Sequence, residues 1–179
     1  MVYVLLGTGF EETEAIATID LMRRAGIQVL SVGINGPIVT GSHGIGVQAD
    51  ISLGEMDLTS MDMIVLPGGL GGVASIKACD AALEAIRFAW ENGKFVAAIC
   101  AGPTILASLG ITDGKNATCY PGCETQMGTA NMVNAAAVTD GKIITGTSAG
   151  CAVPFGLALI AALKGQEEAD RIAKQIVIR

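Results

Sequence analysis

Short apolar segments alternate with amphipathic stretches along the chain, and this alternation limits the possible folds more than any other feature. The apolar segments are rich in Val, Ile and Leu, without the alternating polar positions of a half-exposed strand. The stretches between them are long enough for the helices that connect parallel strands. The sequence therefore predicts a three-layer α/β sandwich with a mostly parallel central sheet and helices on both of its faces.

The expected elements follow from this pattern and from the glycines that end the helices. Strands are expected over residues 2–6, 27–32, 61–66, 94–99 and 143–145. Helices are expected over residues 12–25, 80–92, 153–163 and 167–175. A short hairpin is expected in the glycine-rich stretch 33–50. The 179 residues contain no repeat and no linker, so we expect one domain over residues 1–179.

Charge and hydropathy exclude two classes of partner. The net charge is -6, and Arg23-Arg24 is the one basic cluster, so the sequence does not predict nucleic-acid binding, which needs concentrated Lys and Arg. No window reaches the roughly 18 unbroken apolar residues of a membrane span. We therefore expect neither a nucleic acid nor a membrane as a partner.

The cysteines and the start of the chain indicate a compartment. The chain has five cysteines, an odd number that does not suit a complete disulfide framework. The first residues lack the basic segment of an export signal and lead directly into the first expected strand. Both observations favour reduced thiols and a cytoplasmic location.

One motif near the start has the appearance of a nucleotide-binding turn. Gly7-Thr8-Gly9 follows the first expected strand and precedes a helix. Glu12 occupies the third glycine position and would repel a pyrophosphate, and the segment Val32-Gly33-Ile34 lacks the acidic residue that holds a ribose. The chain also has no Gly-Lys-Ser or Gly-Lys-Thr element, so no nucleotide cofactor is expected.

Two further motifs lack the partners that their chemistry needs. Gly146-Thr147-Ser148-Ala149-Gly150 matches the G-x-S-x-G pattern, but a nucleophilic serine needs a later histidine, and the one histidine is His43. We therefore interpret this segment as a tight turn beside the site. Cys119 and Cys123 are spaced loosely like metal ligands, but a zinc site needs two more, so no metal is expected.

Cys100 is the candidate nucleophile. It follows the expected strand 94–99 and precedes Ala101-Gly102-Pro103, where Pro103 suits the first turn of a helix. The free N–H groups and dipole of that helix would stabilise a thiolate, so we expect the pKa of the thiol to be lowered. The alternative is a buried cysteine at a strand end that acts as a small hydrophobic side chain.

Glu14 is the candidate acid or base beside this thiol. If it points with the apolar face of its helix, burial would raise its pKa and keep it protonated, able to donate a hydrogen bond to the thiolate or to move a proton. Gly68, Gly69 and Ala101 offer N–H groups for an oxyanion hole. Alternatively, Gly68 and Gly69 simply form a tight turn. Glu11 and Glu12, which lie at the start of the same helix as Glu14, are interpreted as acidic residues that compensate the helix dipole.

Four segments, in order along the chain, resemble the ThiJ/PfpI superfamily, most closely its Parkinson-linked redox-protein branch. They are Gly9-Phe10-Glu11-Glu12-Thr13-Glu14, Met22-Arg23-Arg24-Ala25-Gly26-Ile27, Val65-Leu66-Pro67-Gly68-Gly69 and Ala97-Ala98-Ile99-Cys100-Ala101-Gly102-Pro103. The resemblance implies a flavodoxin-like sandwich that forms a homodimer. It also implies that Cys100 is the reactive cysteine, Glu14 its buried partner, Gly68 and Gly69 backbone donors, and Arg24 part of the dimer-proximal stretch.

The same resemblance implies several activities. Members are described as glyoxalases acting on methylglyoxal, as deglycases of glycation adducts, as oxidative-stress sensors with holdase chaperone behaviour, and in some branches as proteases. The family histidine that follows the cysteine by about twenty residues is replaced here by Tyr120 in Thr118-Cys119-Tyr120-Pro121. A tyrosine is a poor general base at neutral pH, so a cysteine protease is disfavoured.

We therefore predict a cofactor-free, cysteine-dependent glyoxalase or deglycase acting on reactive carbonyls. The alternatives are a sensor or holdase that works through Cys100 oxidation, and a degenerate member with a binding role only. His43 matches a family arginine near the pocket, and is otherwise a surface group. Cys119 and Cys123 are either resolving thiols for an oxidised Cys100 or packed side chains.

Overall fold

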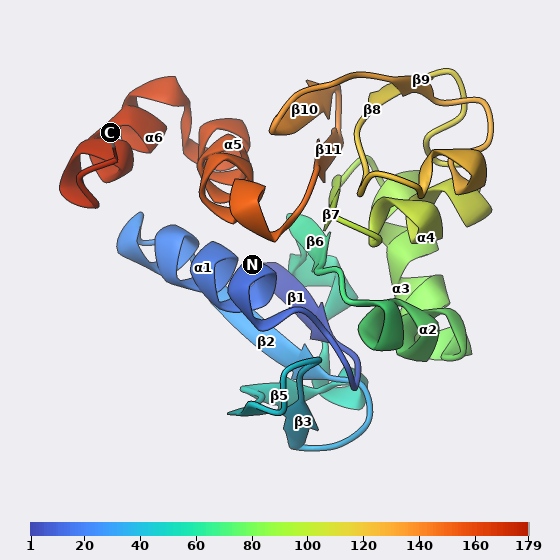
Figure 1. Ribbon diagram of the computed structural model, residues 1–179. Helices are drawn as coiled ribbons and strands as arrows, with labels where there is room; N and C mark the ends of the chain where they lie inside the picture. Colours follow the sequence, from blue (N-terminus) through green and yellow to red (C-terminus); the bar gives the residue numbers. More distant parts are fainter. Residues whose placement is uncertain (179) are drawn as a thin grey trace.

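A seven-stranded sheet forms the centre of the protein in the computed structural model, which describes residues 1–178 (Figure 1). Its strand order is β10-β11-β7-β6-β1-β2-β5. All neighbouring pairs are parallel except β10 with β11, which confirms the predicted mostly parallel sheet. The strands are β1 (Val2–Leu6), β2 (Val29–Gly33), β5 (Ile51–Ser52), β6 (Met63–Leu66), β7 (Phe95–Ile99), β10 (Ala137–Asp140) and β11 (Ile143–Gly146).

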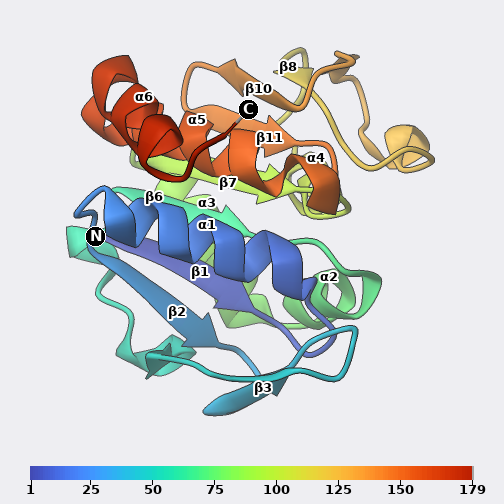
Figure 2. The ribbon, with the colours of Figure 1, turned by 60° about the vertical axis from the view of Figure 1, so that its left-hand side comes forward.

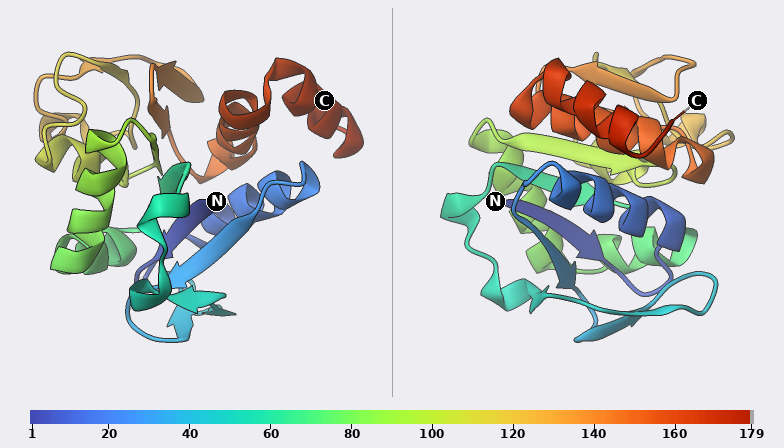
Figure 3. Two further views of the ribbon diagram at one scale, coloured as in Figure 1. Left: turned by 180° about the vertical axis from the view of Figure 1, so that it is seen from behind. Right: turned by 90° about the vertical axis from the view of Figure 1, so that its left-hand side faces the viewer.

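Helices cover both faces of this sheet and complete the three layers (Figures 2 and 3). One face carries α1 (Glu12–Arg24), α5 (Ala152–Lys164) and α6 (Gln166–Gln175), and the other carries α2 (Leu70–Lys77), α3 (Asp80–Glu91) and α4 (Pro103–Ser108). Each face has its own apolar core. Ala15, Ile19 and Met22 of α1 are buried against the first face, and Ile86 of α3 against the second, as the helical spacing predicted.

Smaller elements lie at the margins of the sheet. The hairpin expected in the glycine-rich stretch is formed by β3 (Ile38–Thr40) and β4 (Gly46–Gln48). A second, parallel pair joins β8 (Asn116–Ala117) to β9 (Asn131–Met132). Four short 3₁₀ turns complete the described chain: η1 (Leu53–Glu55), η2 (Leu58–Ser60), η3 (Glu124–Gln126) and η4 (Ala149–Cys151). Within residues 1–178, no helix combines the length and the apolar character that crossing a membrane requires.

Helix α2 and strand β10 are among the elements that were not expected from the sequence. Helix α2 contains Gly71 and Gly72, which weaken helix propensity and hide it from a pattern-based prediction. A Cβ on Gly72 would lie 2.7 Å from the Cα of Phe10, so glycine is needed where the helix touches the loop after β1. Strand β10 precedes the Asp140-Gly141 turn and pairs antiparallel with β11 at the edge of the sheet.

The topology brings several loops to one edge. The parallel strands β1, β6, β7 and β11 end at Leu6, Leu66, Ile99 and Gly146, and the segments that follow them meet there. Ligands of open α/β sheets bind beyond the carboxyl ends of the strands. Cys100 follows β7 directly, so the fold places it at this edge.

Candidate active site

The backbone of Cys100 has an unusual conformation. Its φ is 66°, in the left-handed region that side chains other than glycine rarely adopt. Two hydrogen bonds hold it there: its N–H donates to the carbonyl of Gly146 over 2.9 Å, and its carbonyl accepts the N–H of Tyr120 over 2.8 Å. Such a conformation costs about 1–2 kcal/mol and is found at functional sites, where the surroundings enforce it.

The Cys100 thiol is half-buried and faces both main-chain donors and a carboxyl group. The N–H groups of Ala101 and Gly69 lie close enough to the sulfur to favour its ionised form, and Ala101 does so from the turn between β7 and α4, as expected. The Glu14 carboxyl group lies close enough to the thiol for each group to change the pKa of the other. Cys100 and Glu14 thus come from the β7–α4 turn and the first turn of α1, and the sequence prediction that they lie together is consistent with this geometry.

Glu14 is completely buried. Its Oε2 accepts the N–H of Gly68 over 2.7 Å, and its Oε1 has no hydrogen-bond partner among the nitrogen and oxygen atoms of residues 1–178. Burial raises the pKa of Glu14 from 4.5 to about 7, against the lowering effects of Cys100 and of the Gly68 N–H, while the nearby Glu11 raises it further. The carboxyl group therefore titrates near neutral pH, as its expected burial predicted.

Gly68 leaves the space in which these two side chains meet. A Cβ at this position would lie 2.6 Å from the Cβ of Cys100 and 2.6 Å from Oε2 of Glu14. The expectation that Gly68 is an oxyanion donor is wrong, because its N–H is already bound to the Glu14 carboxyl. Gly68 therefore positions the acid, and the N–H groups of Gly69 and Ala101 are the ones that face the sulfur.

The predicted lowering of the thiol pKa is also wrong. Burial, followed by the charge of Glu14 and its hydrogen bond, raises the pKa of Cys100 to about 12, and the N–H groups of Ala101 and Gly69 only partly oppose this. The sequence argument considered the helix N-terminus and omitted the effect of an ionised neighbour. The pair consequently loses one proton near pH 7 and shares the remaining proton between sulfur and carboxyl.

A cavity of about 490 Å³ opens over this pair. Tyr120 lies in its wall with 49% of its surface exposed, which agrees with the position expected from the resemblance. Ser148 and its neighbours after β11 also contribute, so the G-x-S-x-G segment is a turn beside the site, as interpreted. The lining consists of Glu11, Glu14, Gly69, Leu70, Cys100, Ala101, Tyr120, Ser148, Ala149 and Gly150.

Glu12 has a role that the sequence did not reveal. It is buried and accepts the N–H of His43 over 2.7 Å, while its other oxygen lies 3.0 Å from Nδ1 of His43. Although burial raises its pKa, these bonds and the N–H of Ile45 lower the pKa of Glu12 to about 2. The side chain therefore anchors the loop between β3 and β4 to α1.

The structure places the other candidate residues away from the thiol. His43 is exposed and pairs with Glu12, which with the neighbouring Glu11 raises the pKa of the imidazole. Arg24 lies at the far end of α1 and pairs with Asp20 over 2.6 Å. Cys119 and Cys123 are buried in the apolar core, which agrees with the packing alternative. Burial also raises the pKa of Cys119 to about 11.

One group among residues 1–178 has the composition of a metal site. Ligand atoms of Glu11, Glu12 and His43 lie within 4.8 Å of one another. The hydrogen bonds between Glu12 and His43 account for this compactness without an ion.

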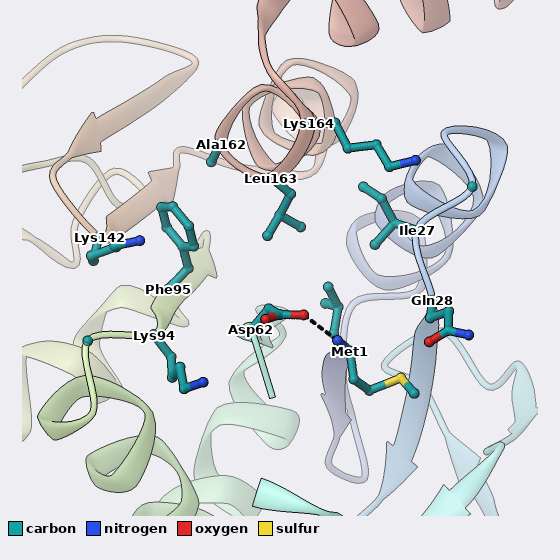
Figure 4. A pocket seen from close by; sticks show the side chains of 13 residues that line it. Met1, Ile27, Gln28, Asp62, Lys94, Phe95, Lys142, Ala162, Leu163 and Lys164 are labelled. Carbon is teal, nitrogen blue, oxygen red and sulfur yellow. Dashed lines mark hydrogen bonds and ion pairs between the residues drawn. The ribbon is translucent and has the colours of Figure 1, made fainter. Parts of the chain in front are cut away.

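A second hollow of about 490 Å³ lies at the opposite edge, beside the amino ends of the strands (Figure 4). Three of its cations are already engaged: the amine of Met1 pairs with Asp62, Lys164 Nζ donates to the carbonyl of Ala25 over 2.7 Å, and Lys142 Nζ lies 3.8 Å from the ring centre of Phe95. The fourth, Lys94, also lines the hollow. The lining contains no thiol, imidazole or hydroxyl group. The reactive chemistry therefore belongs to the Cys100 edge.

Comparison with known proteins shows which family the whole chain is similar to. A family model described as the DJ-1/PfpI family matches residues 1–162. The protein dj-1beta of Drosophila melanogaster is 35% identical over 98% of this chain and 95% of its own length. Its crystal structure superposes with a TM-score of 0.94 and covers 99% of this chain and 97% of the other.

Two similar proteins have names that state an activity. A protein named deglycase from Pyrococcus abyssi is 33% identical over 80% of this chain and 87% of its own length. A protein named glutathione-independent glyoxalase from Caenorhabditis elegans is 29% identical over 94% of this chain and 90% of its own. Similarity to proteins with these names indicates an enzymatic role without fixing the reaction.

Proposed function

The chain belongs to the DJ-1/PfpI family, and from this premise we propose that it is a cysteine-dependent enzyme acting on small reactive carbonyls such as methylglyoxal. The observation that carries the proposal is the position of the Cys100 side chain beside the buried Glu14 carboxyl, where both meet at Gly68 under an open cavity. The names of the two similar proteins, a deglycase and a glyoxalase, support the same substrate class.

The shared proton explains how the thiol becomes a nucleophile. Transfer of that proton from Cys100 to Glu14 gives a thiolate beside a neutral acid, and the N–H groups of Ala101 and Gly69 stabilise the charge on sulfur. This form is an isomer of the thiol–carboxylate pair and needs no base from outside. Tyr120, in the place of the family histidine, is therefore not required to remove the proton.

With methylglyoxal, the reaction is an internal oxidation and reduction. The sulfur bonds to the aldehyde carbon, and the aldehyde oxygen receives the proton held by Glu14. Glu14 then moves the proton of the former aldehyde carbon to the ketone carbon, and the hydroxyl proton of the sulfur adduct passes to the former ketone oxygen, which leaves a thioester at the oxidised carbon and an alcohol at the reduced one. Water cleaves the thioester, releasing lactate and the free thiol, so atoms and electrons balance with no further oxidant or reductant.

Formation of lactate from methylglyoxal tests this function. Cys100→Ser should abolish turnover, and Glu14→Gln should lower kcat by about 10²-fold or more, the usual contribution of general acid–base catalysis. Cys79→Ser is the matched control, because Cys79 caps α3 away from the cavity lining and serine is favourable at such a position. Wild-type turnover in Cys100→Ser would disprove the proposal.

Oxidation of Cys100 as a stress signal is the second candidate function. The two N–H groups at the sulfur would also stabilise the negative charge of a sulfinate. After mild peroxide treatment, mass spectrometry should find the first added oxygens on Cys100. Earlier oxidation of the half-buried Cys79 or Cys151 would exclude this role.

Assembly and location are part of the same proposal. We infer a homodimer from the family resemblance and a cytoplasmic location from the five free cysteines. Sedimentation analysis tests the dimer, and fractionation of the source cells tests the location.

A further inference from the structure

The cavity over Cys100 has a one-sided charge. Its lining contains two carboxyl groups, those of Glu11 and Glu14, and no Lys, Arg or His residue. The rim is apolar, because Leu70 and Tyr120 expose 79% and 49% of their surfaces there. A substrate that enters this cavity therefore meets negative charge and apolar surface.

Glu11 lies in the wall of this cavity. Its N–H donates to the carbonyl of Gly68 over 2.9 Å, which fixes the backbone beside the reactive pair. Its carboxylate lies 3.2 Å from the Ser42 hydroxyl and 3.6 Å from Nδ1 of His43. The field of this carboxylate reaches the reactive centre, since it raises the pKa of Glu14.

The neighbouring His43 cancels the negative charge of Glu11 and Glu12 only in part. His43 lies closer to Glu12, at 3.0 Å, so two carboxylates share one imidazole and the group of three remains negative even when His43 is protonated. The main-chain donors at the cavity floor are engaged: Gly68 binds Glu14, and Gly69 and Ala101 face the sulfur. A carboxylate or phosphate on the body of a substrate would find repulsion from Glu11 and no compensating cation in the lining.

We propose that Glu11 determines specificity, so that the enzyme accepts uncharged α-oxoaldehydes with an apolar body and rejects those carrying a carboxylate or phosphate. The inference rests on the proposed function and concerns which carbonyl is accepted. Glu11 acts on the charge of the substrate and not on the bonds that change, so the effect should be equally visible with a reagent that only alkylates Cys100.

The first test compares phenylglyoxal with 4-carboxyphenylglyoxal, which share the reacting group and differ in charge. In the wild type, kcat/KM should be about tenfold higher for the neutral substrate, the size expected of a single partly screened charge. Glu11→Gln should bring the ratio close to one, and Glu11→Lys should reverse it. Glu167→Gln removes the same charge from an exposed position on α6 and should leave the ratio unchanged. Added salt should reduce the wild-type ratio.

The second test uses iodoacetamide and iodoacetate on Cys100, with the ratio of rates normalised to that of a free thiol. It should show the same preference for the neutral reagent and the same loss in Glu11→Gln. Equal rates in the wild type, or a ratio that Glu11→Gln does not change, would overturn the inference. Absence of lactate formation from methylglyoxal would overturn the proposed function alone, because the alkylation ratio still reports on Glu11.

Discussion

Replacing Glu14 by glutamine should change the pH dependence of Cys100 alkylation in a characteristic way. In the wild type, the pair loses one proton near pH 7 and keeps the second to about 12. Between these values, the share of molecules whose charge is on sulfur does not vary with pH. The alkylation rate should therefore follow the first loss of a proton and then become constant.

The expected magnitude follows from the pKa of about 7. The singly ionised pair makes up about a hundredth of the molecules at about pH 5 and about nine tenths at about pH 8. Wild-type alkylation should thus rise about ninetyfold over this range and change little up to about pH 9. In Glu14→Gln the neighbouring charge is gone but burial still raises the pKa of the thiol, so the rate should rise about tenfold per pH unit through about pH 9 without a plateau.

The assay is the rate of iodoacetamide addition to the peptide that contains Cys100, measured by mass spectrometry at each pH. Cys119 and Cys123, which are buried, provide an internal measure of unfolding, because their labelling should stay slow while the fold is intact. A wild-type rate that keeps rising tenfold per unit beyond pH 8, or an equal plateau in Glu14→Gln, would refute the shared-proton explanation.

Three further outcomes are expected. Gly68→Ala should lower the free energy of unfolding, measured by urea titration, by about 1–3 kcal/mol and remove most of the activity. The reason is that the added Cβ would lie 2.6 Å from Cβ of Cys100 and 2.6 Å from Oε2 of Glu14. Gly54→Ala is the control, because its added Cβ meets nothing within 4 Å and should change the free energy of unfolding little. Folding raises the pKa of Glu14 from 4.5 to about 7, so protonation of Glu14 favours the folded state. This contribution to the free energy of unfolding is complete below pH 4.5 and is lost as the pH rises through 7. Between pH 4.5 and pH 7, the free energy of unfolding of the wild type should therefore fall by about 3 kcal/mol relative to that of Glu14→Gln. Equal dependence of the two unfolding free energies on pH would contradict the burial of the carboxyl group. Because folding lowers the pKa of Glu12 to about 2, Glu12→Gln should be less stable than wild type above pH 4.5, and the difference should disappear as the pH falls through about 2; a constant difference would contradict the ionic anchor.

The layered fold could be predicted because its signal is local. Runs such as Val2–Leu6 and Phe95–Ile99 are apolar at every position, and every residue of the first run is indeed buried. Helix α2 escaped prediction because Gly71 and Gly72 serve contacts with the distant Gly9 and Phe10, which no local pattern contains. Short edge elements such as β10 also lack a signal of their own, since their pairing with a neighbour defines them.

The site could be predicted in its residues but not in its electrostatics. Cys100 and Glu14 were identified from their positions at element ends and from the family motifs. The use of the Gly68 N–H by Glu14, and the raised pKa of the thiol, depend on atoms that only the folded chain brings together. The loop anchor formed by Glu12 has a weak sequence signal at best, because an acidic residue in a first helical turn usually needs no partner.

The reactive pair joins segments that are far apart in the sequence: the bond between Glu14 and Gly68 spans 54 residues, and strand β6 lies between β1 and β7 in the sheet. A nascent chain that has not yet paired these strands has no such neighbour for its thiol, which then behaves like any solvent-exposed cysteine. The environment that sets the reactivity of this thiol is thus acquired only when strands β1, β6 and β7 have paired. The rate at which this thiol becomes labelled can therefore report when a refolding molecule reaches its native state.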